Sequence, residues 1–132
     1  MLDTNMVSFL LHQRRTYERI YLRLDKLRFE QRMISAISYA ELQLMIQKAA
    51  NPVPKAAKVS ILLMSFNIPD FGQAAAQQYG LIRAHLERNG ERIGPMDMLI
   101  AAHARSLGAV VVTDNEREFR RVPDLLVENW LH

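Results

Sequence analysis

The sequence predicts a single α/β domain over residues 1–132, with a mostly parallel sheet. Short apolar segments alternate along the chain with longer segments of helical periodicity, which is typical of a parallel sheet covered by helices. The run Ala109–Thr113 (AVVVT) is short, continuous and rich in β-branched residues, as expected of a strand buried on both faces. A length of 132 residues fits one domain, and no repeat or linker divides the chain.

The elements of the first half are predicted from apolar spacing and helix-start signals. In chain order they are a strand end at Met1–Thr4, a short helix at Asn5–His12, an amphipathic helix at Thr16–Glu30, a short strand at Arg32–Ile37 and a helix at Ser38–Gln47. In the amphipathic helix the apolar residues share one side and the basic residues the other. Ser38 and Glu41 have the spacing of a capping box, which marks the start of the helix that follows.

The elements of the second half are delimited by proline and glycine. In chain order they are a turn at Asn51–Pro54, a helix at Ala56–Ser65, a short strand near Phe66–Ile68, a helix at Phe71–Asn89, a helix from Gly94-Pro95 to Leu107, a strand at Ala109–Thr113, a short helix ending near Arg121 and a last strand at Leu125–Glu128. Pro95 suits the first position of its helix. Thr113 and Glu116 again have capping-box spacing.

The composition excludes several kinds of protein. The chain has no cysteine, which rules out disulfides and thiolate metal sites. No apolar run approaches the roughly 20 residues that span a bilayer, and the N-terminus does not resemble a secretory signal. We therefore expect a cytoplasmic protein that does not contact a membrane. Neither a phosphate-binding glycine loop nor a nucleophilic triad is present, and the four histidines show no metal-ligand spacing.

The charge of the chain is unevenly distributed. The formal net charge is +3, and the stretch Leu10–Arg32 holds seven basic but only three acidic residues. Such a concentration indicates an anionic partner such as nucleic acid. The alternative is an ordinary solvated helix face, which charge runs often form.

Four separated segments place polar, mostly acidic residues directly after apolar ones. The candidates are Asp3, Glu41, Asp97 and Asp114, with Asn115 beside the last. Taken singly, each acid fits a helix cap or a first-turn position. Taken together, they lie where strands pass into helices, and in a parallel sheet most of those places share one edge. A cluster of carboxylates repels itself and favours a hard divalent cation, which indicates metal-dependent phosphodiester chemistry.

Four segments together resemble a known family. The segments are MLDTN, SAISYAEL, IGPMDMLIAAHA and VVVTDNEREFRRVPDLLVENW. They resemble the PIN-domain ribonucleases, most closely the VapC toxins of bacterial toxin–antitoxin pairs, over essentially the whole chain. The resemblance implies a three-layer α/β/α sandwich with a mostly parallel sheet of four or five strands. It also implies an endoribonuclease that depends on Mg²⁺, with Mn²⁺ as an alternative ion, and that cuts RNA, with a tRNA anticodon stem-loop (that of initiator tRNA) as the expected substrate.

The resemblance also assigns roles to residues. Asp3 and Asp97 match the acids that ligate the metal, and Glu41 matches the acid that ligates through water or orients the attacking water. The remaining matches are the amide Asn115 at the fourth catalytic position, where the family usually has an acid, and the supporting residues Asn5, Thr113 and Asp114. Because an amide carries no charge, a second metal would be held less well.

The implied partners are RNA, a VapB-type antitoxin and a second copy of the chain. The antitoxin tail is expected in an apolar groove between the first helices and the Ser38–Gln47 helix, within a larger toxin–antitoxin assembly. A homodimer would make a shared basic channel for RNA. The candidates for phosphate contact are Arg14, Arg15, Arg19 and Arg23.

Two other functions remain open from the sequence. The first is a catalytically weak PIN-like module that binds RNA, an antitoxin or both, with Asn115 marking a decayed site. The second is a nuclease or phosphatase of another carboxylate–metal class, which would prefer DNA or a small phosphoester.

Overall fold

The computed structural model describes all residues from Met1 to His132. Its sheet has two regular parallel strands, β1 (Val111–Val112) and β2 (Val127–Glu128). Isolated parallel bridges extend this pairing, and they join Leu2 to Val112, Leu2 to Ile34 and Met33 to Asn67. Neighbouring parallel segments therefore lie in the order Asn67, Met33–Ile34, Leu2, β1, β2.

The predicted parallel arrangement is confirmed, but a sheet of four or five regular strands is not. Each isolated bridge involves a single residue pair, and after Leu2 and Ile34 the chain turns into a helix almost immediately. Helix α1 (Thr4–Leu11) begins two residues after Leu2, and helix α3 (Ala36–Lys48) begins two residues after Ile34.

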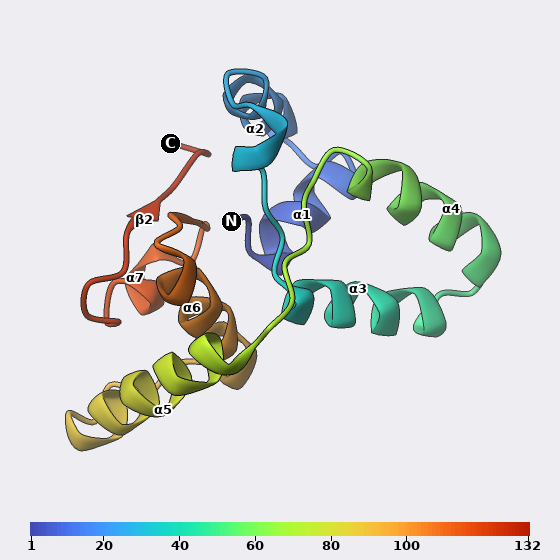
Figure 1. Ribbon diagram of the computed structural model, residues 1–132. Helices are drawn as coiled ribbons and strands as arrows, with labels where there is room; N and C mark the ends of the chain where they lie inside the picture. The colour runs from blue at the N-terminus through green and yellow to red at the C-terminus, as the bar shows by residue number, and fades with distance from the viewer.

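Helices cover both faces of this narrow sheet (Figure 1). Besides α1 and α3 they are α2 (Tyr17–Leu24), the short 3₁₀ helix η1 (Phe29–Gln31), α4 (Pro52–Leu63), α5 (Gln73–Arg88), α6 (Pro95–Leu107) and α7 (Glu116–Phe119). The order of helices and strands is the predicted one. None of the helices is both long enough and apolar enough to span a membrane.

The predicted helix Thr16–Glu30 is too long. Helix α2 ends at Leu24, and the chain then tightens into hydrogen bonds between residues three apart, from Lys26 N to Arg23 O and from Leu27 N to Leu24 O. This change of pitch turns Leu27 toward the core, where it packs against buried residues. The residues up to Glu30 therefore form a turn and the start of η1.

Two predicted boundaries around α3 are also wrong. The strand prediction Arg32–Ile37 extends too far, because Ser35 is the N-cap of α3 and its Oγ accepts a hydrogen bond from Ile37 N at 3.0 Å. Ser38 is therefore buried inside the first turn and does not form a capping box with Glu41.

The predicted turn at Asn51–Pro54 is the start of α4. Asn51 is the N-cap, and two prolines stand in the first turn. Proline is tolerated there because the first N–H groups of a helix have no partner within it.

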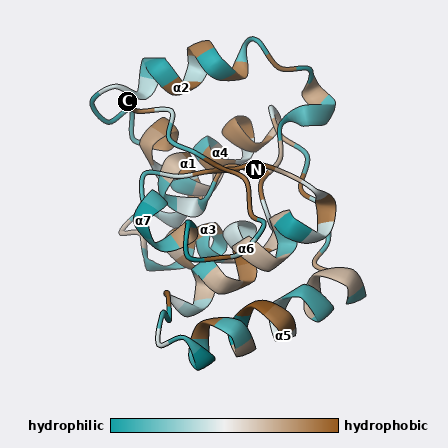
Figure 2. Ribbon diagram, turned by 90° about the vertical axis from the view of Figure 1, so that its left-hand side faces the viewer, coloured by the Kyte–Doolittle hydropathy of each residue, from teal (hydrophilic) through white to brown (hydrophobic).

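The core is divided into two clusters by the sheet. Leu2 and Val112 face a cluster built with α1 to α4, whereas Met1 and Val111 face a cluster built with α5, α6 and the region of α7. This division follows from the alternation of side chains along a strand. Figure 2 shows the apolar central segments between helices on either side. The predicted three-layer α/β/α sandwich is confirmed.

Candidate metal centre

A polar cleft of about 620 Å³ opens at the carboxyl ends of the central segments. Its lining residues are Asp3, Thr4, Asn5, Ser8, Glu41, Met45, Asp97, Asp114 and Asn115. The structure thus brings every predicted acid to one cleft, together with both predicted amides. Thr113 is fully buried and hydrogen-bonded to Asp3.

Asp3 is held by two neighbouring segments of the sheet. It is the N-cap of α1, and its Oδ1 accepts a hydrogen bond from Met6 N at 2.9 Å. Its Oδ2 accepts one from Thr113 Oγ1 at 2.5 Å, and this hydroxyl in turn accepts one from Asn115 N at 2.9 Å. Thr113 is therefore not the cap predicted from its spacing to Glu116, because Asn115 is the N-cap of α7. The Thr113 hydroxyl instead fixes the orientation of the Asp3 carboxylate.

The surroundings of Asp3 disfavour its charged form. Only 4% of the residue is exposed, and this burial raises its pKa to about 7. The hydrogen bonds from Thr113 and Met6 lower the pKa, while the charges of Asp114 and Asp97 raise it. The balance leaves a carboxylate that a nearby cation would stabilise strongly.

Glu41 projects from α3 and is oriented by a residue that the sequence analysis missed. Thr4 Oγ1 donates a hydrogen bond to Glu41 Oε1 at 2.6 Å and lies 2.9 Å from Ser38 Oγ. The Thr4 side chain, between Asp3 and Asn5, thus links α1 to α3. The sequence did contain a signal for Thr4. It stands in the MLDTN segment between Asp3 and Asn5, which were both predicted site residues.

Asp97 lies in the first turn of α6, where the helix dipole favours a negative charge. Burial raises the pKa of Asp97 to about 6, and the charges of Glu118 and Glu41 add to that increase. The Asn115 amide, whose Nδ2 lies 3.4 Å from Asp97 Oδ2, acts in the opposite direction.

Glu118 is a second residue that the sequence analysis missed. Asn115 Nδ2 donates a hydrogen bond to Glu118 Oε2 at 2.8 Å, so the amide lies between the carboxylates of Glu118 and Asp97. The sequence signal for Glu118 was its spacing from Asn115, because residues three apart on a helical turn share a face.

Asp114 lies at the exposed side of the cleft. Asn5 Nδ2 contacts both of its carboxylate oxygens, at 2.8 and 2.9 Å. Asn5 and Asp114 thus form a pair between α1 and the segment that precedes α7, and this pair closes one side of the cleft.

The donor set of the cleft fits a hard divalent cation. Its side chains offer carboxylate oxygens, which Mg²⁺ prefers, and the pKa values of Asp3 and Asp97 are raised by burial first and by neighbouring acids second. No three acidic side chains form a ready-made ligand group in this arrangement. Mg²⁺ requires only one or two carboxylates and keeps several waters, so the open cleft suits it.

The four predicted RNA-binding arginines lie outside the cleft. Three of them make contacts within the protein. Arg19 Nη1 donates a hydrogen bond to Leu131 O at 2.6 Å. The guanidinium groups of the other two lie over aromatic rings, that of Arg23 at 5.9 Å from the centre of the Trp130 ring and that of Arg14 at 5.4 Å from the centre of the Phe9 ring. The side chain of Arg15 is exposed and makes no such contact.

Comparison with known proteins supplies a family. The PIN domain family matches residues 1–125. The tRNA(fMet)-specific endonuclease VapC of Shigella flexneri is 37% identical over 132 residues, which cover 98% of this chain and 96% of that protein. Ribonuclease VapC2 of Rickettsia felis is 37% identical, with the same coverage.

Solved structures agree with this relationship. VapBC-1 from nontypeable Haemophilus influenzae superposes with a TM-score of 0.91 at 32% identity, covering 100% of this chain and 98% of that one. VapBC2 from Rickettsia felis, bound to a DNA fragment from its promoter, gives a TM-score of 0.88 at 35% identity, covering 98% and 97%. The family resemblance drawn from the four sequence segments is confirmed.

The raised pKa of Asp3 predicts how stability changes with pH in metal-free buffer. The unfolded chain loses this proton near pH 4 and the folded protein only near pH 7, so the folded state binds more protons between these values. The free energy of unfolding should therefore fall by a few kcal/mol as the pH rises from 4 to 7. Urea denaturation in EDTA measures this fall.

The substitution Asp3→Asn tests the assignment, because asparagine keeps an acceptor oxygen at the cap but does not titrate. It should remove the larger share of this pH dependence, and the raised pKa of Asp97 should leave a smaller fall between pH 4 and 6. Asp124→Asn, which replaces an acid outside the cleft, should leave it unchanged. An Asp3→Asn protein with the parent's pH dependence would show that another group is responsible.

Proposed function

The chain belongs to the PIN domain family, among its VapC ribonucleases, and on that premise we propose that residues 1–132 act as one PIN domain that cuts RNA with Mg²⁺ or Mn²⁺. The observation that carries this proposal is the shared cleft of Asp3, Glu41 and Asp97. The pKa values of both aspartates are raised by burial and by neighbouring acids. A site that concentrates negative charge in this way suits a divalent cation and, through it, a phosphate.

We assign the catalytic roles as follows. Asp3 and Asp97 would hold the ion, which would lower the pKa of a bound water and offset charge on the phosphate. Glu41, held by the Thr4 hydroxyl, orients the attacking water and accepts its proton. The water oxygen would then bond to phosphorus as the bond to the leaving ribose oxygen breaks, and that oxygen would take up a proton from solvent water in the open cleft. Thr113 acts through Asp3, whose carboxylate it orients.

Asn115 and Glu118 act as a unit in this proposal. The amide donates to Glu118 and lies beside Asp97, so it separates two carboxylates that would otherwise repel each other. Glu118 supplies at this side of the cleft the negative charge that Asn115 lacks. Asp114, paired with Asn5, supports the opposite side.

The proposed substrate is a tRNA anticodon stem-loop, with that of initiator tRNA as the first choice. Its support is the relative from Shigella flexneri, which is described as tRNA(fMet)-specific. A loop also exposes a splayed backbone that an open cleft can reach. Because tRNA is a cytoplasmic substrate, we propose that the protein acts in the bacterial cytoplasm.

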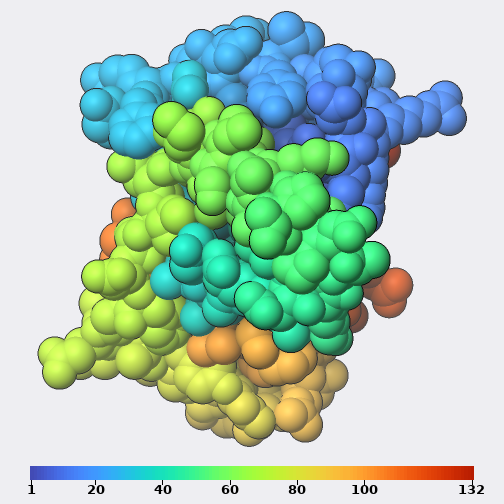
Figure 3. Space-filling model, turned by 90° about the vertical axis from the view of Figure 1, so that its right-hand side faces the viewer, coloured from blue at the N-terminus to red at the C-terminus, as the bar shows by residue number.

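The proposed partner is a VapB-type antitoxin, since the solved relatives are VapBC complexes. A groove of about 530 Å³ is the candidate contact, lined by Leu10, Leu11, His12, Gln13, Tyr21, Lys55, Lys58, Ile61 and Leu62. It lies between the first helices and α4, whereas the sequence analysis expected it beside α3. Figure 3 shows α4 (green) and the first helices (blue) side by side on one face.

We also propose that the protein forms a homodimer, in a larger assembly when the antitoxin is bound. The support is apolar exposure on the hairpin of α3 and α4, where Leu44 is 55% exposed and Met64, the C-cap of α4, is 78% exposed. Exposed apolar groups gathered on neighbouring elements are typical of an interaction surface.

The metal assignment predicts the effect of Asp97→Asn. Loss of a direct ligand should reduce cleavage of purified tRNA by more than the roughly 10- to 100-fold typical of residues that only support a ligand. EDTA should abolish the parent activity, and Asp124→Asn should cut at the parent rate. Gel analysis of tRNA fragments provides the measurement. A parent rate in Asp97→Asn would contradict the assignment.

The same assay separates the rival functions. RNA binding by the parent without cleavage, while a related active VapC cuts in parallel, would favour the non-catalytic module. Preference for single-stranded DNA or for a small phosphomonoester would favour a different carboxylate–metal class.

If Asn115 and Glu118 act together, the Asn115→Asp variant should bind metal more tightly than the parent protein. A carboxylate there adds charge beside Asp97, so the affinity for Mn²⁺ should rise roughly tenfold. In EDTA the variant should be less stable than the parent, because three acids are then adjacent. Titration calorimetry and thermal melting measure the two effects. Gln77→Glu, an exposed amide-to-acid change on α5, is the matched control, and an equal effect there would rule out a local cause.

The exposed Arg15 predicts a salt-dependent contact with RNA. Arg15→Gln should weaken binding of any RNA sequence and reduce the slope of log affinity against log salt by about 1. Arg92→Gln, at an exposed position between α5 and α6, is the matched control. Filter binding of tRNA at several salt concentrations gives both slopes. If the slope does not change in Arg15→Gln, the RNA follows another surface.

A further inference from the structure

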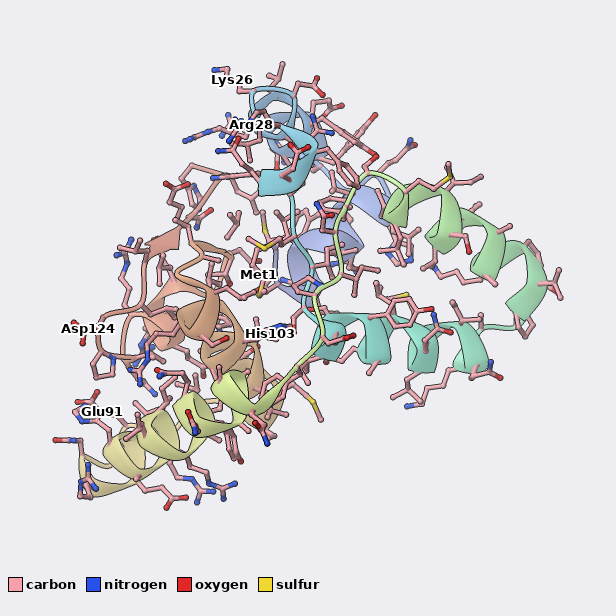
Figure 4. All side chains as sticks on the ribbon, in the orientation of Figure 1. Met1, Lys26, Arg28, Glu91, His103 and Asp124 are labelled. Carbon is pink, nitrogen blue, oxygen red and sulfur yellow. The ribbon has the colours of Figure 1, made fainter.

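His103 is a buried polar residue that the proposed mechanism does not use. It lies in α6, is 1% exposed, and Figure 4 shows it beside the N-terminal end of α3. Its Nδ1 lies 2.7 Å from the Oγ of Ser35, which is fully buried and is the N-cap of α3. The same Oγ accepts a hydrogen bond from Ile37 N. One serine hydroxyl therefore both starts α3 and contacts α6.

Packing alone does not account for a histidine at this position. Its buried Nε2 has no partner of good hydrogen-bond geometry, although the backbone of Asp70 lies near enough to raise the pKa of the ring, and a poorly paired buried polar atom costs stability. A leucine would fill a similar volume without that cost. Burial also lowers the pKa of His103, which keeps the ring neutral near pH 7. What the histidine adds is its directed contact with Ser35.

The position of this contact links the two layers of the molecule. The buried residues of α3 belong mainly to one core cluster and those of α6 to the other. The Ser35–His103 contact is the one side-chain hydrogen bond between α3 and α6. Glu41 follows Ser35 by six residues and Asp97 precedes His103 by six, about 9 Å along each helix.

We propose that Ser35 and His103 form a positioning pair that fixes helices α3 and α6 relative to each other and thereby sets the separation of Glu41 from Asp97 across the cleft. Neither residue lines the cleft. They act through the carboxylates, in the way that supporting hydrogen bonds orient the ligands of metal sites. This inference rests on the proposed function, because it concerns the geometry of the same centre.

The test compares variants that break the contact with variants that keep it. His103→Leu removes the ring nitrogen, and Ser35→Ala removes the hydroxyl. His103→Asn keeps a polar atom near the position of Nδ1, and Ser35→Thr keeps the hydroxyl. Gln78→Ala is the matched control, because it removes a 2.6 Å hydrogen bond from Arg105 of α6 that leads to α5 instead of α3.

The measurements are kcat and KM for tRNA cleavage, Mn²⁺ affinity by calorimetry, and the melting temperature in EDTA. Both contact-breaking variants should lower kcat about 10- to 100-fold and weaken Mn²⁺ binding, with KM for tRNA unchanged. The conservative variants should recover most of both values. The double variant should lose no more than the worse single one, because the two residues act through one contact.

Other outcomes would overturn the proposal. A fall in melting temperature with kcat and Mn²⁺ affinity at parent values would leave the pair a purely structural role. Equal losses of kcat and Mn²⁺ affinity in Gln78→Ala would show that any disturbance of α6 has this effect, and that the contact with Ser35 is not special. If the parent binds Mn²⁺ but does not cut RNA, the proposed function fails. The positioning role of Ser35 and His103 is then judged by the Mn²⁺ affinities of the variants alone. If the parent binds no Mn²⁺, both proposals fail.

Discussion

The carboxylate of Asp3 is almost fully buried, beside two other acids, and much of the structure serves to hold it there. Thr113 and the start of α1 provide its hydrogen bonds, yet these do not offset the loss of water, so its pKa stays near 7. A protein gains nothing in stability from such a group. A bound cation would reverse this cost, because its positive charge stabilises the buried carboxylate in its charged form and that attraction contributes to the affinity for the ion.

The two core clusters explain why the cleft lies where it does. The central segments of the sheet are only one or two residues long, and side chains alternate from Met1 to Leu2 and from Val111 to Val112 between the clusters. Asp3 and Thr113 follow at the same edge and are both buried there, at the base of the cleft. Helices α3 and α6, one from each layer, begin near this edge, so Glu41 reaches the cleft from one side and Asp97 from the other.

The α/β class, the order of the elements and the gathering of the acids were predictable, since each depends on local periodicity and on the rule that parallel strands share a carboxyl edge. The capping boxes at Ser38 and Thr113 were wrong because the same spacing serves tertiary contacts, here with Thr4 and Asp3. The roles of Glu118 and His103 were not predicted from the sequence, for a related reason. Their partners lie on other elements or depend on where a helix begins, and single-sequence spacing does not contain that information.

The pairing of Leu2 with Val112 also has a consequence during synthesis. The first residues of the chain complete their place in the sheet only against residues that are made more than a hundred positions later. Contacts of such long sequence separation form late in folding. Until the segment around Thr113 has been made, Asp3 lacks the Thr113 hydroxyl, and Leu2 has only the Met33–Ile34 segment beside it. A nascent chain therefore has no assembled cleft before the segment around Thr113 has been made, and a nuclease of this kind cannot act on RNA until then.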